Sequence, residues 1–323
     1  MPIGAEQRYY LKLKAAYYYY EKDYTQAEIA QMLGVSRITL GKLLKEAREE
    51  RMVKIEIVDH RNVKHLLELE AGLKDRFGLD DIKVVDCVEN ERHQVSRKIA
   101  IAGAKYVEHI LRSGDRVGMA WGRTLEQMVH NLNENRNITG IEVVTLMGGA
   151  GTARSSSQPN IIAQRMIQKY GGSGYIINAP YICQSEELCR AIKAEPHIAD
   201  VIERSRNADI TLVGIGEKPS KMVDYNANYG YRSETVDSLL AAGAVGDICA
   251  QFYDIQGEPC NTDVCRRVVS IDLPDLKKHK KVIAIGGGPD KHESVLGALR
   301  GGYLNVLITD KFTAQAVADS PAP

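Results

Sequence analysis

Glycine-rich turns stand at several points where an apolar run of the sequence gives way to a more polar segment. They are residues 121–124 (WGRT), 148–151 (GGAG), 214–216 (GIG) and 286–291 (GGGPDK). Where such a turn joins a strand to a helix, unpaired N–H groups and the helix dipole favour an anion. Arg123 and Lys291 add positive charge, which suits a phosphate group, although plain turn geometry and surface cations are the alternatives.

Several such turns along one parallel sheet favour a shared ligand site, because ligands of open sheets bind at the carboxyl ends of the strands. Asp247, in the segment 243–247 (GAVGD), is a further candidate. A carboxylate next to small residues suits bidentate recognition of sugar hydroxyls, and a helix cap is the alternative. The segment therefore adds a candidate contact for hydroxyl groups.

No pattern of a catalytic, metal or cofactor site stands out. The glycine turns do not match the phosphate-cradling P-loop or the GxGxxG of dinucleotide-binding folds. The six cysteines include no Cys-x-x-Cys pair, which argues against structural zinc and a disulfide framework. The histidines are scattered, without a nucleophile–base constellation. We therefore predict no catalytic residue, no metal and no cofactor, although catalytic groups meet in space and not in sequence.

A second kind of chemistry is indicated by residues 25–48 (TQAEIAQMLGVSRITLGKLLKEAR). Thr25 lies three residues before Glu28, a capping box that satisfies free N–H groups at a helix start. Gly34 can end this helix in the left-handed conformation, and Ser36 is a good N-cap for the next helix. Two short helices joined by a glycine-containing turn predict a helix-turn-helix.

The second of these helices is expected to enter the major groove of DNA. Leu40, Leu44 and Ala47 recur at i, i+4 and i+7, which predicts a buried face with a basic face opposite. Residues 36–48 carry four basic side chains and one acid, a local net charge of 4 − 1 = +3. A helical interaction module with a solvated basic face is the alternative. The predicted DNA-binding residues are Thr25, Gln26, Ser36, Arg37, Ile38, Thr39, Lys42 and Lys45.

Two nearby features have open explanations. Gly41 is unfavourable inside a helix by about 1 kcal/mol, which either a close approach of the backbone to DNA or close helix packing would explain. The run Tyr17–Tyr20 lies on the expected first helix, where alternate rings must face inward and outward. A mixed core and surface role is favoured over a stacking platform for single-stranded nucleic acid.

The elements that position these residues fall into two parts. The first fifty or so residues predict helices, with no strand signal before Met52–Val58. Beyond them, short β-branched runs alternate with helical stretches, the pattern of a parallel sheet covered on both faces. The predicted strands are Ile82–Val88, Arg116–Trp121, Ile141–Met147, Gly174–Asn178, Asp209–Gly216, Lys281–Gly286 and Asn305–Asp310. The predicted helices of this part include His93–Leu111, Gln158–Tyr170 and Lys291–Gly301.

We therefore predict an α/β protein of two domains, with a helix at Arg61–Phe77 joining them. Residues 1–58 form a helical helix-turn-helix domain, and residues 59–323 form a Rossmann-like parallel α/β domain. Lys plus Arg and Asp plus Glu number 42 each, so any affinity for DNA must rest on a local cluster. Neither a signal peptide nor the roughly 20 apolar residues that span a bilayer are visible. We expect a cytoplasmic protein with no membrane partner.

The chain resembles the SorC-type sugar-binding transcriptional regulators over almost its full length. The resemblance is carried by residues 23–57, 114–124 (GDRVGMAWGRT), 143–151 (VVTLMGGAG), 208–216 (ADITLVGIG), 242–257 (AGAVGDICAQFYDIQG) and 301–310 (GGYLNVLITD). It implies that the large domain has a fold similar to sugar-phosphate isomerases and CoA transferases but serves as a sensor. It also implies a sugar effector, commonly phosphorylated, and a homodimer or homotetramer assembled through the large domain.

The resemblance also implies a set of ligand contacts at the matching turns. Two of them belong to the segment 154–160 (RSSSQPN), which varies among such proteins, and the turn around Lys291 departs from other members in detail. The expected effector-binding residues are Gly122, Arg123, Thr124, Gly148, Gly149, Gln158, Asn160, Asp247 and Lys291.

We therefore predict a DNA-binding transcriptional regulator of a carbohydrate-utilisation operon, controlled by a sugar or sugar phosphate. Effector binding would change the packing of the large domains and hence the spacing of paired DNA-binding heads on double-stranded operator DNA. One alternative is a sugar-phosphate isomerase or deaminase with an attached DNA-binding head. Another is a DNA-binding protein whose large domain only oligomerises. The sugar, the operator and the sign of regulation are left open.

Overall fold

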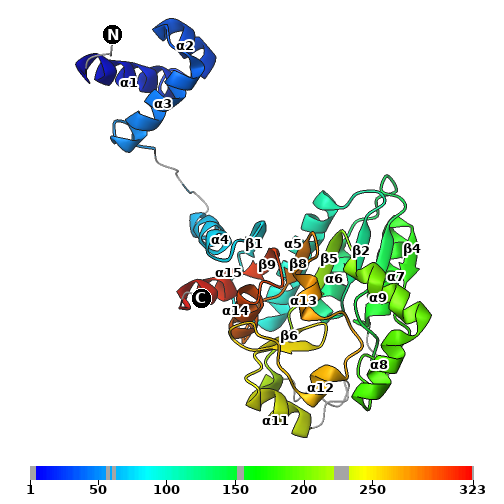
Figure 1. Ribbon diagram of the computed structural model, residues 1–323. Helices are drawn as coiled ribbons and strands as arrows, with labels where there is room; N and C mark the ends of the chain where they lie inside the picture. The colour runs from blue at the N-terminus through cyan, green and yellow to red at the C-terminus, as the bar shows by residue number, and fades with distance from the viewer. Residues whose placement is uncertain (1–4, 56–58, 60–62, 151–155, 222–232, 322–323) are drawn as a thin grey trace. The chain divides into compact units, whose positions relative to one another are not determined.

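The computed structural model describes residues 5–55, 59, 63–150, 156–221 and 233–321 (Figure 1). The chain divides into two compact units, Met1–Asn62 and Val63–Pro323. This division falls shortly beyond the predicted boundary at residue 58. In the predicted strand at Met52–Val58, residues 52–55 form no strand, and residues 56–58 lie outside the described residues.

The first unit is built from helices α1 (Ala5–Tyr20), α2 (Gln26–Leu33) and α3 (Arg37–Glu49). Their small core contains Ala15 of α1, Ile29 of α2 and Leu40 of α3. The predicted face of α3 with Leu40, Leu44 and Ala47 is buried, as expected. Tyr17 is exposed while the next three tyrosines are half-buried, so the mixed role predicted for this run is confirmed.

The two short helices begin and end through the caps that the sequence predicts. The Thr25 hydroxyl accepts a bond from the Glu28 N–H, and the Glu28 carboxylate accepts one from the Thr25 N–H at 2.8 Å. Gly34 ends α2 with a φ of 65°, a left-handed conformation that glycine adopts without steric cost. Ser36 caps α3 by accepting a bond from the Thr39 N–H at 3.1 Å. The predicted helix-turn-helix is therefore confirmed.

The second unit is organised around a seven-stranded sheet with the order β1-β9-β8-β5-β2-β3-β4. Each pair of neighbours runs parallel. The strands are β1 (Asp81–Val85), β2 (Arg116–Met119), β3 (Glu142–Thr145), β4 (Ser173–Tyr175), β5 (Ile210–Gly214), β8 (Val282–Ile285) and β9 (Val306–Asp310). They overlap all seven predicted strands, and the full burial of β8 and β9 shows that both faces of the sheet are covered.

Helices cover this sheet in two rows. One row contains α5 (Arg92–Ile110), α6 (Arg123–Asn131) and α7 (Pro159–Tyr170). The other contains α4 (Lys64–Phe77), α15 (Lys311–Asp319) and α14 (His292–Arg300). The remaining helical segments are α8 (Glu186–Ala194), α9 (Pro196–Arg206), η1 (Pro219–Lys221), α11 (Ser233–Ala241), α12 (Asp263–Arg266) and α13 (Leu273–Leu276). No described helix has the length and apolar character needed to cross a membrane.

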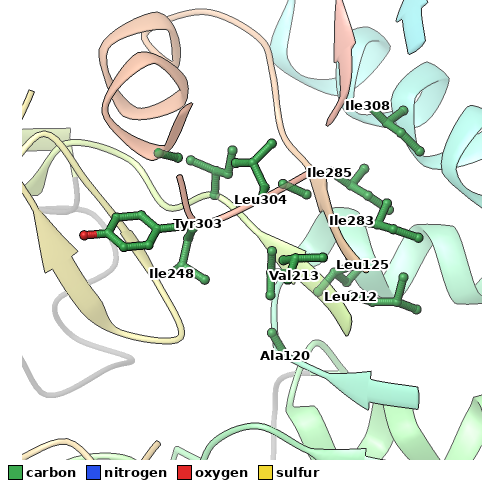
Figure 2. Packing of buried hydrophobic residues seen from close by; sticks show 14 of the residues in the cluster. Ala120, Leu125, Leu212, Val213, Ile248, Ile283, Ile285, Tyr303, Leu304 and Ile308 are labelled. Carbon is green, nitrogen blue, oxygen red and sulfur yellow. The ribbon is translucent and has the colours of Figure 1, made fainter. Parts of the chain in front are cut away.

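The predicted helices agree with the structure within a few residues. Those expected at 93–111, 158–170 and 291–301 are α5, α7 and α14. The helix predicted at Arg61–Phe77 as a link between the parts begins at Lys64 and packs on β1 and α15 of the second unit. Figure 2 shows how side chains of β5 and β8 gather with Leu125 of α6 in the apolar core.

The sequence analysis did not predict two strands of the second unit. β6 (Gly246–Ile248) and β7 (Gln251–Tyr253) form an antiparallel hairpin. Cys249 and Ala250 make its two-residue turn with φ values of 55° and 61°, the left-handed geometry that asparagine and glycine usually adopt there. The Asp247 carboxylate accepts a bond from the Ala250 N–H at 3.0 Å and so holds this turn. Asp247 therefore lies in a strand, and the alternative of a helix cap is wrong.

A buried carboxylate fixes the turn after β8. Asp310 is fully buried at the end of β9, where its Oδ1 accepts bonds from the N–H groups of Phe312 and Thr313 and caps α15. Its Oδ2 accepts bonds from the Gly288 N–H and from the Thr313 hydroxyl, both at 2.7 Å. One side chain thus starts a helix and positions the turn between β8 and α14.

We expect Asp310→Asn to lower the free energy of unfolding by about 3 kcal/mol, because the amide leaves at least one buried N–H facing another donor. Urea unfolding monitored by circular dichroism measures the change. Asp319→Asn is the control, since among the described residues that exposed carboxylate at the end of α15 accepts a bond from the Gln315 side chain alone. An equally small effect of both substitutions would contradict the role given to Asp310.

Candidate functional site

The carboxyl ends of β2, β5 and β8 border a cavity of about 240 Å³. The order of strands reverses at this place, because the chain runs outward from β2 through β3 to β4 and in the opposite direction from β5 through β8 to β9. Open α/β sheets bind their ligands at such a reversal. The turns after β2, β5 and β8 all contribute residues to the lining, including Gly122, Gly216 and Gly287.

Cationic groups outnumber carboxylates in this cavity. Its lining contains Arg92, Arg123 and Lys291 against Glu217 and Asp247, a balance of 3 − 2 = +1. The start of α6 adds to this positive potential, since no side chain caps it and its first three residues line the cavity. Gly122, directly before α6, has a φ of 128°, which a glycine tolerates. The arrangement favours an anionic ligand group.

Lys291 brings its ammonium group into the cavity from the N-terminal end of α14. The Nζ atom donates a hydrogen bond to the carbonyl oxygen of Ile215, in the turn after β5. Burial lowers the pKa of this lysine to about 8, although the carboxylates of Glu217 and Asp247 act in the opposite direction. The ammonium group is therefore charged at neutral pH but sensitive to its surroundings.

Asp247 faces the same cavity from the β6–β7 hairpin. Burial raises the pKa of its carboxyl group to about 6, although Lys291 and the Ala250 N–H favour the charged form. The main-chain oxygen of Asp247 accepts a bond from the Gly216 N–H at 2.8 Å. A Cβ atom on Gly216 would overlap the Asp247 carboxylate, so the glycine of this turn is required by the packing of Asp247.

The structure brings five of the nine expected effector-binding residues together. Gly122, Arg123, Thr124, Asp247 and Lys291 all line the cavity at the strand reversal. Their role in effector binding stays a prediction.

The other four lie elsewhere. Gly149 and Asn160 line a second cavity of about 360 Å³, beside Asn178 and Pro180. Gly148 packs against the backbone after β4, where a Cβ atom would overlap carbonyl oxygens.

Gln158 is buried and bound to the backbone of Ala150 in both directions. Its Oε1 accepts a bond from the Ala150 N–H at 2.8 Å, and its Nε2 donates one to the Ala150 oxygen at 3.1 Å. Effector contact by Gln158 stays a prediction. Gly151 and Arg154, from the sequence blocks around it, lie outside the described residues.

Several lining residues were missed by the sequence analysis. Arg92, at the start of α5, forms an ion pair with Glu217 in the turn after β5. On α5 and α6, the Ser96 hydroxyl lies 3.2 Å from both the Thr124 hydroxyl and the Gln127 side-chain oxygen. These polar residues form no motif, and only their position in the first two turns of α5 and α6, or in the turn after β5, would have indicated them. Within the described residues, no cluster of three or more potential metal ligands occurs.

The first unit presents a separate candidate surface on α3. Of the eight predicted DNA-binding residues, Gln26 is half-buried and the other seven are exposed. Ion pairs with α1 neutralise Glu46 of α3 and Glu50 directly after it, since Arg8 binds Glu46 and the buried Lys12 binds Glu50. Within the described part of the chain, Arg37 and Lys42 form no ion pair, so their charge is available to a partner.

Comparison with known proteins decides the family. The Sugar-bind model, which describes a sugar-binding domain, matches residues 61–318. The sorbitol operon regulator of Klebsiella pneumoniae is 32% identical over 306 residues, which are 94% of this chain and 96% of that protein. This chain belongs to the SorC-type sugar-binding transcriptional regulators.

A second relative, and a crystal structure of the sorbitol operon regulator, match nearly the whole length of the chain. The deoxyribonucleoside regulator of Bacillus subtilis (strain 168) is 31% identical over 309 residues, 96% of this chain and 97% of its own. The crystal structure of full-length SorC from Klebsiella pneumoniae matches with a TM-score of 0.73, 32% identity and coverage of 96% and 99% of the two chains. The predicted fold class is confirmed, and the chain is a transcriptional regulator and not an isomerase or deaminase.

The buried Asp247 predicts an unusual pH dependence of stability in this SorC-type regulator. Its folded pKa of about 6 lies above the ordinary 3.8, so between these values the folded chain keeps a proton that the unfolded chain has lost. Its contribution to stability therefore falls as the pH rises through this window, by about 3 kcal/mol in all.

The measurement is the free energy of unfolding of the wild type and of Asp247→Asn at pH 4 and pH 7. Asparagine keeps the acceptor for the Ala250 N–H and does not titrate. We expect the wild type to lose stability relative to the variant as the pH rises. A constant difference, or one of opposite sign, would show that the carboxyl group is not held in a desolvated site.

Proposed function

We propose that this regulator controls a carbohydrate-utilisation operon by binding a sugar phosphate in the cavity at the strand reversal. The observation that carries the proposal is the meeting of Arg123, Lys291, the uncapped start of α6 and the buried Asp247 in one cavity. A phosphate group suits the cations and the helix start. Sugar hydroxyls suit Asp247, whose carboxylate offers acceptors beyond the one bond to Ala250.

The names of the relatives support an effector of this kind. One is the regulator of a sorbitol operon and another a deoxyribonucleoside regulator. Both names refer to compounds that carry hydroxyl groups. For this chain, we propose a phosphorylated monosaccharide, since the positive charge of the cavity and the α6 start would be left unmatched by a neutral sugar.

Operator binding is proposed for the exposed face of α3. In this assignment residues 1–58 bind double-stranded DNA, and residues 59–323 bind the effector and assemble a homodimer or homotetramer. A paired helix-turn-helix reads half-sites about one helical turn apart, so a change in the packing of the large domains alters DNA affinity. Couplings between such sites are typically about 1–3 kcal/mol. A regulator must be in the same compartment as the DNA that it binds. We therefore propose that this protein is cytoplasmic.

A thermal-shift screen of the full chain against sugars and sugar phosphates tests the effector site. A ligand at a hundredfold excess over its Kd stabilises the folded state by about 2.7 kcal/mol. Arg123→Ala is expected to weaken binding of the phosphorylated hit by about tenfold or more, the loss of one charge-assisted contact. Arg97→Ala, an exposed arginine of α5 outside the cavity, is the control. Equal binding by both variants, or stabilisation by neutral sugars alone, would contradict a phosphate site at Arg123.

The salt dependence of DNA binding tests the α3 surface. If Lys42 contacts a phosphate, Lys42→Ala should reduce the slope of log K against log salt by about 1 and weaken binding to all duplexes alike. Lys105→Ala, an exposed lysine of α5, should leave the slope unchanged. Fluorescence anisotropy with labelled duplexes measures both. An unchanged slope for Lys42→Ala would remove this lysine from the DNA interface.

A further inference from the structure

An exposed isoleucine stands on the surface proposed to meet DNA. Ile38, the second residue of α3, has 77% of its surface exposed, more than any other large apolar residue described in the first unit. It packs into neither the small core of the three helices nor the half-buried residues around it. A single exposed apolar side chain is common on protein surfaces, so the meaning of Ile38 depends on the residues beside it.

Gly41 follows Ile38 by three residues and lies on the same face of α3. The sequence left two explanations for a glycine there, close helix packing and close approach of DNA. A Cβ atom built on Gly41 would meet nothing within 4 Å, so packing within the described unit does not require glycine. Its φ is not in the left-handed region either, since it is absent from the positive-φ residues described. The described residues therefore give no structural reason for this helix-weakening glycine.

The charged residues around Ile38 and Gly41 indicate what kind of partner this face of α3 would bind. Arg37 and Lys42 flank it without ion-pair partners among the described residues, and Lys45 faces only the exposed Glu49 at 3.7 Å. Ile38 and Gly41 together form an apolar strip bordered by cations. Such a surface is complementary to a polyanion that exposes apolar groups between its charged groups. The major groove of DNA does so at each thymine, whose 5-methyl group is its one apolar recognition feature.

We propose that Ile38 and Gly41 form the base-reading strip of α3, with Ile38 packed on thymine methyl groups. Gly41 lets the helix backbone come closer to the groove floor than any residue with a Cβ would permit. Arg37 and Lys42 hold the helix by contacts to phosphates on either side. This proposal rests on the proposed DNA-binding function and adds its sequence preference, which is for thymine at the positions that Ile38 reaches.

The first part of the test removes thymine methyl groups from the DNA. Duplexes that the full-length protein enriches from a random library give the binding site, and each thymine in it is then replaced by deoxyuridine. At one or more positions the wild type should lose about fourfold in affinity, the effect of one buried methyl group. Ile38→Ala should bind the thymine and deoxyuridine duplexes equally. Sensitivity of Ile38→Ala equal to that of the wild type would overturn the proposal.

The second part uses a substitution that should strengthen the helix and weaken binding. Gly41→Ala should slow hydrogen exchange of α3 amides in the full chain, because alanine is the better helix former. It should also weaken binding to the selected duplex by about tenfold or more, comparable to the loss of one base contact. Gly72→Ala is the matched control, since Gly72 also lies in a helix, α4, with nothing within 4 Å of a built Cβ.

The outcomes separate this proposal from the function on which it rests. If the wild type selects a sequence but Gly41→Ala binds it as well as Gly72→Ala does, the strip does not read bases and DNA binding still stands. If no thymine of the selected site loses affinity on replacement by deoxyuridine, the conclusion is again that the strip does not read bases, while DNA binding stands. If the wild type enriches no sequence and binds no duplex, the DNA-binding function itself is wrong, and the proposal falls with it.

Discussion

A carboxylate withdrawn from water shapes the region around the cavity. Asp247 lies buried beside the carboxyl ends of the parallel strands, and the conformation or charge of three neighbouring residues depends on it. Gly216 has no side chain because a Cβ atom would overlap the carboxylate. Ala250 adopts a left-handed conformation that the bond from its N–H to Asp247 maintains. Lys291 supplies a positive charge from α14, which offsets part of the cost of burying a negative one. Without Lys291 the buried carboxylate would lack a nearby positive charge, and without Asp247 the turn at Ala250 would lose its hydrogen bond.

Asp310, at the end of β9 in the seven-stranded sheet, shows what a purely structural carboxylate looks like. Both of its oxygens are occupied, by the N–H groups of Phe312, Thr313 and Gly288 and by a hydroxyl. Asp247 has one such donor and a raised pKa, so it retains capacity for an incoming donor. Both aspartates are buried residues of strands, and their different hydrogen-bond partners, rather than their residue type, distinguish a structural role from a proposed binding role.

The sequence predicted those features that depend on neighbours in the chain. Apolar runs located all seven strands of the main sheet, and the capping pair Thr25 and Glu28 located the helix-turn-helix. The β6–β7 hairpin was missed because three-residue strands around a tight turn leave no periodicity to detect. Arg92 and Glu217 were missed because 125 residues separate them, and only the folded sheet brings them together. Gln158 was expected at the ligand, and in the structure its amide binds the backbone of Ala150.

The pairing of α1 with α3 has a consequence for how quickly DNA is found. Arg8 and Lys12 pair with Glu46 and Glu50, while Arg37 and Lys42 of α3 form no ion pair within the described residues. The exposed surface of α3 thus keeps an excess of positive charge. In the field of a nucleic acid, this uneven distribution of charge experiences a torque that turns the positive surface inward before contact. A larger share of diffusive collisions then begins in a productive orientation, and this gain fades as salt shortens the range of the field.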